Sequence, residues 1–463
     1  MKSPAEKKTF LKKAEKIAFD KVHREKIKFN ISRYDQAVAR GKAIYSDLEL
    51  ARARAGYIKY KIINDLDKYL IEFEDNFTKN GGKVIWAADA QEAIREILKI
   101  ARKNKVKKVV KSKSMTTEEI DLNRFLQQAN IESVETDLGE FIVQQAGQRP
   151  YHIVTPAMHM SKEDIAGLYH KKFSTDEHLT PEELTLYTRK LLRKKFIQAD
   201  MGISGANFLI ADTGGIALTE NEGNAMLSMS FPKIHIAIAG IEKLIPKLED
   251  LGLYWPLLAT HGTGQNMTVY NSIITGPKKN GEKDGPEEMY VILLDNGRTR
   301  LLAKERQRQA LSCIRCGACL NACPIYKNVG GHTFDTTYSG PIGSVITPYM
   351  RDQRKYSHLS FACTICGKCT EVCPVKIPLH ELLLVNRDDA VRNGFYTYFD
   401  KASIKVSTKF LLSRKKLDMF GGKMKNFGAG LFAEKAWGPR RDLPEFAEKS
   451  FSQLWKEKHG EEK

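Results

Sequence analysis

The chain has 463 residues, of which 42% are hydrophobic and 28% charged, proportions typical of soluble globular proteins. They exclude a wholly disordered chain, and no apolar run of about 18 residues is present to form a membrane-spanning helix. The N-terminal residues lack the apolar core of a secretory signal, so we expect a cytosolic protein with reduced thiols. At roughly 150 residues per domain, the length predicts about three domains.

The net charge of +18 is concentrated at the two ends of the chain. Residues 1–60 carry a net charge of +9 and residues 395–463 carry +6, which leaves +3 for the middle. Basic flanks favour an acidic partner or an anionic membrane surface, although a solvated helical face gives the same pattern. The chain has no zinc-finger spacing and no RNP-type aromatic motif, so we expect no nucleic-acid partner.

The first segment, residues 1–64, is predicted to be helical and basic. Its apolar residues recur at helical spacing with lysines between them. Such a stripe can pack onto the rest of the chain, dock a partner protein or bind weakly to a membrane surface. The stripe consists of Phe10, Leu11, Ala14, Ile17, Ala18 and Val22.

Residues 65–300 alternate between predicted strands and predicted helices. A threonine cap followed by Pro181 marks the start of one helix clearly. Strands that alternate with helices predict an α/β domain with a mainly parallel sheet. We expect strands at 83–87, 106–111, 131–136, 206–211, 215–219, 234–239 and 290–294, and helices at 91–103, 117–129, 181–199 and 241–248.

Four glycine-rich turns lie among these strands, at 202–205, 212–215, 219–224 and 261–265. Ligands of α/β domains bind beyond the carboxyl ends of the strands, and glycine-rich turns expose N–H groups that hold anions. A carboxylate or phosphate site is therefore expected, although ordinary tight turns explain the same residues. None of the turns matches a nucleotide-binding loop. The candidate anion- or substrate-binding residues are Lys113, Gly214, Gly215, Glu220, Asn221 and Gln265.

Catalytic residues are not evident. Every cysteine belongs to the pattern described next, so none is free to act as a nucleophile. Glu220 and Glu222 are able to share a pocket and His261 to act as a base, but a surface pair and a loop histidine are the commoner explanations of such residues. We therefore assign no catalytic residue.

All eight cysteines fall within residues 313–373, in two runs of identical spacing. Each run reads C-x2-C-x2-C-x3-C-P, the spacing of [4Fe–4S] ferredoxins. Three thiolates within seven residues, found twice, fit iron–sulfur clusters better than zinc, which takes pairs of cysteines separated by a longer loop. Disulfides are not expected in a cytosolic chain of this size. The runs are Cys313, Cys316, Cys319, Cys323-Pro324 and Cys363, Cys366, Cys369, Cys373-Pro374.

In two-cluster ferredoxins the fourth cysteine of each run ligates the other cluster. Gly317 and Gly367 are expected where the backbone passes close to a cluster, since glycine has no Cβ. Two clusters with crossed ligands lie close together and can pass single electrons from a donor to an acceptor. The predicted ligands are Cys313, Cys316, Cys319 and Cys373 for cluster 1, and Cys363, Cys366, Cys369 and Cys323 for cluster 2.

Residues 301–394 are expected to form a mostly α-helical module around both clusters. The 39 residues between the runs exceed what a compact β-type ferredoxin uses, and they include a helix-favouring stretch at 345–358. The residues before the first run and after the second also have helical spacing. Residues 395–463 form a basic extension, in which three apolar residues at 410–412 precede the basic residues 414–416.

Several of these segments together resemble the lactate utilisation protein B family. The similar segments are 111–115, 137–141, 202–207, 219–224, 263–265, 295–298, the first cysteine run and 330–332. The resemblance implies a LUD domain, similar in fold to sugar-phosphate isomerases and CoA-transferases, followed by a two-cluster ferredoxin module. It also implies a role in oxidising L-lactate to pyruvate together with two companion proteins, one with a cysteine-rich redox domain and one with a second LUD domain.

Two hypotheses of different classes follow. The first is an electron-transfer subunit of a lactate-oxidising system, which needs no nucleophile in this chain. The second is a LUD enzyme of the transferase or isomerase type, with Glu220 as the reactive carboxylate by analogy of fold alone and with clusters in a structural or sensing role. A redox sensor that controls a partner through its clusters is a third possibility.

Overall fold

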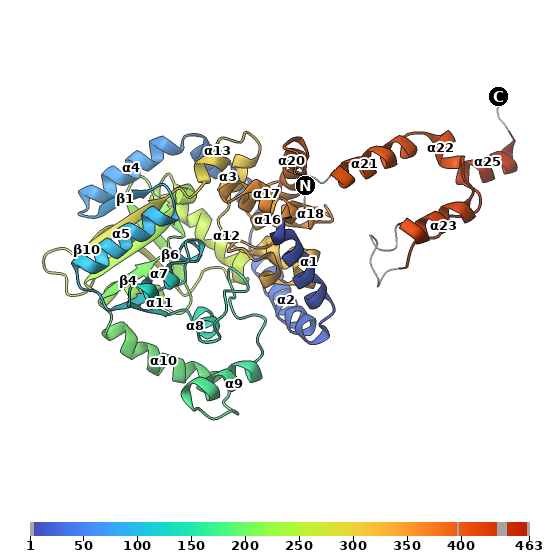
Figure 1. The fold of residues 1–463 in the computed structure, drawn as a ribbon. Helices are drawn as coiled ribbons and strands as arrows, with labels where there is room; N and C mark the ends of the chain where they lie inside the picture. Colours follow the sequence, from blue (N-terminus) through green and yellow to red (C-terminus); the bar gives the residue numbers. More distant parts are fainter. Residues whose placement is uncertain (1–3, 396–397, 433–441, 461–463) are drawn as a thin grey trace. The chain divides into compact units, whose positions relative to one another are not determined.

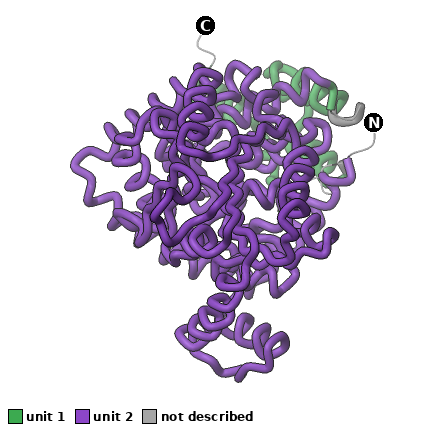
Figure 2. The backbone as a smooth tube through the Cα atoms, turned by 90° about the vertical axis from the view of Figure 1, so that its left-hand side faces the viewer, with its two compact units in different colours: residues 1–3, 394–463 green, residues 4–393 purple. Residues whose placement is uncertain are grey.

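The computed structural model describes residues 4–395, 398–432 and 442–460. Residues 4–393 cluster into one unit, and the described residues from Gly394 onward belong to a second (Figure 2). No helix in the described part of the chain is both long enough and apolar enough to cross a membrane.

Six parallel strands form the main sheet of the first unit, in the order β1-β10-β7-β4-β2-β3 (Figure 1). Every residue of the central strand β7 is buried, as expected for a parallel sheet covered on both faces. The predicted α/β domain with a mainly parallel sheet is confirmed. The strands are β1 Lys83–Ala87, β2 Lys108–Lys111, β3 Glu132–Glu135, β4 Met201–Ser204, β7 Ile234–Gly240 and β10 Glu288–Leu294.

Helices cover this sheet because alternate strand residues point to opposite faces. On one face, Ile236 and Ile238 pack against α5 (Ala90–Lys103) and α7 (Leu122–Gln128). On the other face, Ala237 and Ala239 pack against α4 (Leu66–Lys79) and against a smaller sheet. The smaller sheet has the order β8-β5-β6-β9, with β5 Phe208–Ile210, β6 Gly215–Glu220, β8 Leu244–Ile245 and β9 Tyr270–Ile274.

Some predicted elements are wrong, and tertiary packing explains each of them. Residues 202–205 were expected to form a turn, but they contribute to the buried strand β4. A Cβ on Gly202 would lie 1.8 Å from the carbonyl oxygen of Ser228, so glycine is required there by close packing of α11 (Asn224–Ser230), not by a turn. Residues 261–265 form the end of α12 (Leu251–Thr263), with Gly264 in the left-handed conformation that ends a helix.

Two predicted helices also differ from the structure. The helix expected at 117–129 begins earlier, at the Ser114 cap, and is broken at Asp121, whose φ is +56°. It forms the two short helices α6 (Met115–Glu119) and α7. The helix expected at 241–248 is a 3₁₀ turn at Ile241–Lys243 followed by β8.

Other helix predictions are close to the observed elements. Helix α10 (Pro181–Ile197) begins with the expected Thr180 cap, which forms a reciprocal capping box with Glu183. Helix α5 matches the predicted helix at 91–103 within one residue. Four elements were not predicted from the sequence: α8 (Leu138–Gln145), α9 (Lys162–Phe173), α12 and β9.

The cysteine-rich module is helical throughout, with no strand among residues 301–393. Three N-terminal helices, α1 (Ala5–Ala18), α2 (Lys21–Lys42) and α3 (Leu48–Asn64), pack against it or against α12. Phe10 of α1 is buried against the rings of Phe334 and His358, so part of the N-terminal stripe packs onto its own unit. The module helices are α13 Arg298–Leu302, α14 Ala318–Ala322, α15 Pro324–Val329, α16 Gly340–Met350, α17 Gln353–Tyr356, α18 His358–Phe361, α19 Lys368–Glu371 and α20 Leu379–Arg392.

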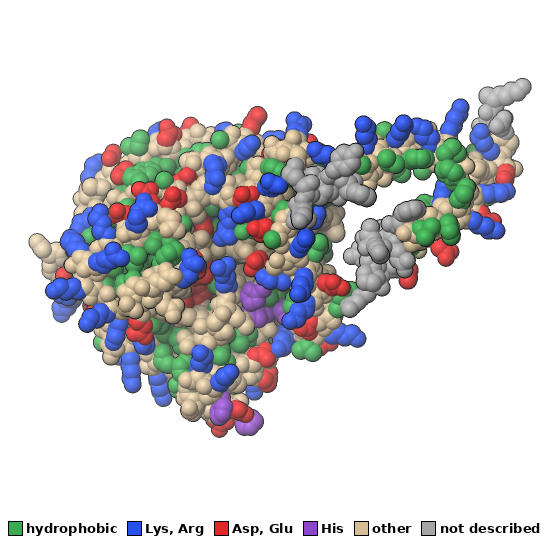
Figure 3. Space-filling model, viewed as in Figure 1, with side chains coloured by type: hydrophobic (Ala, Val, Ile, Leu, Met, Phe, Trp, Pro, Cys, Tyr) green, Lys and Arg blue, Asp and Glu red, His purple; other side chains and the backbone are tan. Residues whose placement is uncertain are grey.

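The second unit consists of short helices with an unusually apolar surface. Leu412 is 83% exposed and Phe427 is 71% exposed. Figure 3 shows such hydrophobic side chains on these helices among lysines and arginines. The helices are α21 Tyr398–Leu411, α22 Arg414–Asp418, α23 Gly422–Phe432 and α25 Phe451–His459.

Candidate cluster sites and the adjoining cavity

The eight thiols are all free, and their mutual electrostatic influence divides them into two groups. Burial raises the pKa of Cys319, and the thiols of Cys313, Cys316 and Cys373 raise it further. Burial raises the pKa of Cys369 to about 12, with further contributions from Cys363, Cys323 and Cys366. Each group therefore contains three thiols of one run and the last thiol of the other.

Backbone N–H groups point at sulfur in the same way in both runs. The N–H of Arg315 donates to the Sγ of Cys313 at 3.4 Å, and the N–H of Ile365 donates to the Sγ of Cys363 at 3.3 Å. Both donors adopt a left-handed backbone, with φ of +61° and +56°, which is uncommon for residues other than glycine. An N–H donor favours the charged thiolate, the form that binds iron.

The fourth cysteine of each run accepts a bond of the same kind. The N–H of Tyr326 donates to Cys323 at 3.5 Å, and the N–H of Ile377 donates to Cys373 at 3.4 Å. Donor chemistry, thiol grouping and backbone turns all fit two [4Fe–4S] clusters. Among the described residues, no three His, Cys, Asp or Glu side chains lie close enough together to bind a single metal ion. A [4Fe–4S] cluster does not require this, because its four ligands bind four different iron atoms.

The two loops differ in their surroundings. Cys316 is 7% exposed, whereas Cys366 at the same place in the second run belongs to the exposed class. A Cβ on Gly317 would lie 3.0 Å from Val154 and 3.1 Å from His152, but a Cβ on Gly367 would meet nothing within 4 Å. The first loop is thus packed against the α/β domain, and the second is not.

A buried ion network joins the first loop to the carboxyl edge of the main sheet. Arg298, which follows β10, donates to Glu242 at 2.5 Å and to both carboxylate oxygens of Glu119 at 2.8 and 2.9 Å. Arg315 donates to the other oxygen of Glu242 at 3.2 Å, and the hydroxyl of Tyr338 donates to Glu119 at 2.6 Å. Although burial raises the pKa of Glu242, Arg298 and Arg315 lower it to about 2, so Glu242 stays ionised.

This network was not predicted from the sequence. A signal was present, because Glu242, Lys243 and Arg298 are charged residues that come shortly after the strongly apolar strands β7 and β10. At such positions the carboxyl ends of parallel strands meet.

A cavity of about 350 Å³ lies at the same edge of the sheet. Its wall includes Lys113, Asp137, Gly205 and Lys243, which follow β2, β3, β4 and β7. On the side of the first cysteine run the wall includes Arg315 and Cys316. The cavity therefore connects the place where ligands of α/β domains bind with the first thiol group.

Of the six residues predicted to bind an anion or substrate, Lys113, Glu220 and Asn221 line this cavity. The carboxylate of Glu220 accepts from the N–H groups of Ala225 and Met226, at 2.6 and 3.0 Å, and so caps α11. Lys113 donates to the carbonyl oxygen of Val154 and lies 4.0 Å from Asp137. Burial, followed by the Asp137 charge, raises the pKa of the neighbouring Glu222 to about 7.

The other three predicted residues lie elsewhere. Gly214 and Gly215 are at the opposite end of β6, where a Cβ on Gly214 would lie 2.3 Å from the backbone of α4. Gln265 forms a reciprocal pair of 3.0 Å hydrogen bonds with Asn221 but does not line the cavity. His261 is buried in α12, and its Nδ1 lies 2.8 Å from the carbonyl oxygen of Leu257.

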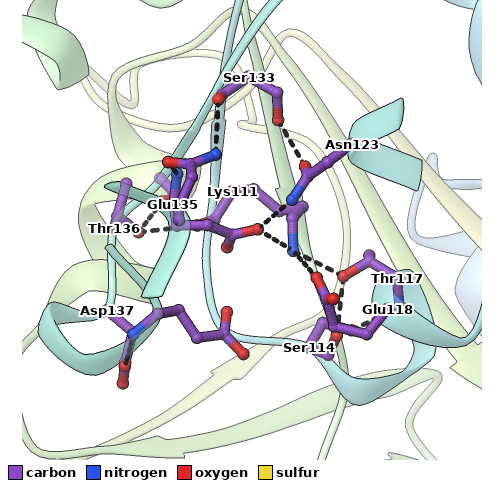
Figure 4. Close-up of polar contacts among 12 residues, drawn as sticks. Lys111, Ser114, Thr117, Glu118, Asn123, Ser133, Glu135, Thr136 and Asp137 are labelled. Carbon is purple, nitrogen blue, oxygen red and sulfur yellow. Dashed lines mark hydrogen bonds and ion pairs between the residues drawn. The ribbon is translucent and has the colours of Figure 1, made fainter. Parts of the chain in front are cut away.

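Lys111, two residues before Lys113, is not available to an anionic ligand. Its ammonium group lies 2.7 Å from Glu135 and 3.5 Å from Glu118, and it donates to Thr117 at 2.8 Å (Figure 4). Burial opposes the charge of Lys111, but Glu135 and Glu118 hold its pKa above the usual value. This lysine therefore neutralises carboxylates behind the cavity wall.

Comparison with known proteins gives consistent results. The LUD domain family matches residues 70–294, and the 4Fe-4S dicluster domain family matches residues 309–377. The chain is 43% identical over 357 residues to lactate utilization protein B of Bacillus velezensis, covering 77% of this chain and 75% of the relative. The chain belongs to the lactate utilization protein B family.

A second relative adds a broader description. An Escherichia coli K12 protein named as an uncharacterized electron transport protein, YkgF, is 39% identical over 423 residues, covering 89% of both chains. Membership of the lactate utilization protein B family brings a LUD domain followed by a dicluster domain, and that domain implies two [4Fe–4S] clusters. The family names support an electron-transfer role in lactate utilisation.

Proposed function

We propose that this chain is the iron–sulfur electron-transfer subunit of a multi-protein system that oxidises L-lactate to pyruvate. The observation that carries the proposal is the grouping of the thiols. Helix α14 of the first run packs against α19 of the second, and Cys373 lies near enough to Cys319, and Cys323 to Cys369, to influence their thiols electrostatically. Crossed ligation keeps two one-electron carriers close together. The matched domain ranges support a LUD domain over residues 65–300 and a cluster module over 301–394.

Each cluster has an assigned set of ligands in this proposal. The first is held in the loop packed against the α/β domain, and the second in the exposed loop. The N–H groups directed at four of the sulfur atoms stabilise the thiolates. The ligands are Cys313, Cys316, Cys319 and Cys373 for cluster 1, and Cys363, Cys366, Cys369 and Cys323 for cluster 2.

The α/β domain has a positioning role in this proposal. The pair formed by Arg298 and Glu242 holds Arg315, and with it the backbone that donates to Cys313. A transferase-type role for Glu220 has less support, because backbone N–H groups already occupy both of its carboxylate oxygens.

We further propose that this chain is cytosolic and works with two companion proteins, one with a cysteine-rich redox domain and one with a second LUD domain. The exposed surroundings of Cys366 favour the second loop as the contact with one of them. The basic second unit, with its exposed apolar side chains, is suited to weak binding at an anionic membrane surface.

The proposal is tested by anaerobic assay of the full chain with both companions, L-lactate and an artificial electron acceptor. Cys316→Ser and Cys366→Ser should each abolish lactate-dependent electron flow while circular dichroism shows an intact fold. Unchanged electron flow in both variants would reject the proposal and favour an activity of the LUD domain itself.

A further inference from the structure

The cavity beside Cys316 contains a cationic side chain whose hydrogen-bonding capacity is not filled. The side chain of Arg315 is 7% exposed, and its guanidinium donates to Glu242 through Nη2 only. Its Nε and Nη1 have no hydrogen-bond partner in the structure. Leaving such donors buried and unpaired is costly, which points to a ligand that the side chain is built to receive.

The position of Arg315 is fixed rather than adjustable. Its guanidinium carbon lies 4.4 Å from the centre of the Tyr338 ring, and Glu242, which orients it, is itself held by Arg298. Nε and Nη1 lie on opposite edges of the planar guanidinium, so a carboxylate accepts a charge-assisted hydrogen bond from one of them and not from both.

The surrounding charge also favours an anion. Lys243 lines the same cavity, and although burial lowers its pKa to about 8, it remains mainly charged at neutral pH.

A second group of charges in the wall limits the anion to one negative charge. The carboxyls of Asp137, Glu220 and Glu222 influence one another, whereas Arg315 and Lys243 lie with Glu242. A dianion would bring a negative charge toward these carboxyls. A ligand with one carboxylate and a neutral hydroxyl or carbonyl would place its charge beside Arg315 and Lys243 and bring no second negative charge to the three carboxyls.

We propose that a small monocarboxylate of the hydroxy- or keto-acid class binds in this cavity, with its carboxylate on an unpaired N–H of Arg315 beside Lys243. Apolar wall residues such as Val154, Leu258 and Ala259 would enclose its carbon chain. The ligand would then lie against the loop of Cys316, between the strand ends and cluster 1. The inference rests on the proposed function for its choice of lactate and pyruvate as probes.

The test is anaerobic equilibrium dialysis of the cluster-containing full chain, without companions, against radiolabelled L-lactate, pyruvate and inorganic phosphate. We expect saturable binding of lactate or pyruvate and none of phosphate. Arg315→Gln should weaken that binding by roughly tenfold or more, because it removes a charge-assisted donor. Arg387→Gln is the matched control, since Arg387 donates to the carbonyl oxygens of Ser360 and Cys363 and does not line the cavity.

If Arg315→Gln loses iron, Ala259→Leu replaces it as the deciding variant, because it fills the cavity without changing a charge. Three results would overturn the inference: no saturable binding of lactate or pyruvate, phosphate binding in their place, or binding unchanged by the deciding variant. An altered EPR signal of cluster 1 with unchanged binding would show that Arg315 serves the cluster alone, and would equally overturn it. None of these results bears on electron flow with companions, which tests the proposed function separately.

Discussion

The two cysteine runs share their spacing, the left-handed residue before the second cysteine and the N–H bond to the first sulfur, but their surroundings differ. In the first loop, Arg315 joins an ion network that reaches three strand ends of the α/β domain. In the second loop, the corresponding residue is Ile365, and the neighbouring Lys368 pairs only with Glu371 at the surface.

This difference distinguishes the residues that bind a cluster from the residues that pack the first loop against the α/β domain. The thiols and the N–H donors recur in both loops, so we attribute them to the cluster. The guanidinium, the packed glycine and the cavity described above belong to the first loop, so we attribute them to its contact with the α/β domain. The second loop, with Cys366 exposed, is then the side open to a partner.

Substitution of the fourth cysteine of either run should have the largest effect, which is the loss of one cluster. With crossed ligation, Cys373→Ser should remove cluster 1 although Cys373 belongs to the second run, and Cys323→Ser should remove cluster 2. Each variant should retain about half of the iron. Iron analysis and EPR of the anaerobic proteins measure this, and loss of cluster 2 from Cys373→Ser would show that ligation is not crossed.

Alanine substitution of the equivalent glycine in each loop should have the next largest effect, which is a loss of stability. Gly317 and Gly367 both have φ near +80°, so alanine costs about 1–2 kcal/mol at either site. Gly317→Ala also forces a Cβ against Val154 and His152, which adds about 1–3 kcal/mol. Thermal unfolding should therefore show a larger loss for Gly317→Ala, and equal losses would mean that the first loop is not tightly packed.

Chelator sensitivity should distinguish the two clusters in the unmodified chain. In the proposed assignment, cluster 2 has the exposed Cys366 as a ligand, whereas the corresponding residue of cluster 1, Cys316, is buried. A chelator added after mild oxidation should remove the EPR signal of cluster 2 first. Loss of both signals at the same rate would contradict the difference in burial.

A smaller effect is expected from pH on carboxylate binding in the cavity. Glu222, with its pKa raised to about 7, is neutral below that pH and negative above it. Affinity for a monocarboxylate should therefore fall a few-fold as the pH rises through 7. In Glu222→Gln the decrease near pH 7 should disappear, which leaves only the decrease near pH 8 that deprotonation of Lys243 causes. A decrease that persists near pH 7 would assign it to another group.

The smallest effect concerns the second unit. Its basic and exposed apolar side chains predict weak binding to anionic vesicles at low salt, which high salt removes. Sedimentation of the full chain with such vesicles measures this. A protein that stays in the supernatant at low salt would end the proposal of membrane contact.

Much of the fold was predictable because local patterns agreed with the tertiary structure. The Thr180 cap and the apolar strands at 83–87 and 234–239 are examples. The prediction failed at Gly202, because a sequence does not show which of two structural roles a glycine has. In a turn it allows an unusual φ, whereas in β4 it makes room for the Ser228 carbonyl.

The cysteines of the candidate site could be predicted from the sequence, but the residues around them could not. Spacing within a run reveals the ligands, since they are close in the chain. The network of Glu119, Glu242, Arg298 and Arg315 joins residues up to 196 positions apart, and nothing local marks Arg315 as their partner. Gly214 and Glu220 are near in sequence but lie at opposite ends of one strand.

The most direct measurement is EPR of the anaerobically purified full chain, with iron and sulfide counting, before and after L-lactate is added with both companions. The account predicts iron and sulfide for two cubanes and, on reduction, a signal broadened by the interaction of two neighbouring spins. Zinc in place of iron, or clusters that stay oxidised beside active companions, would contradict it.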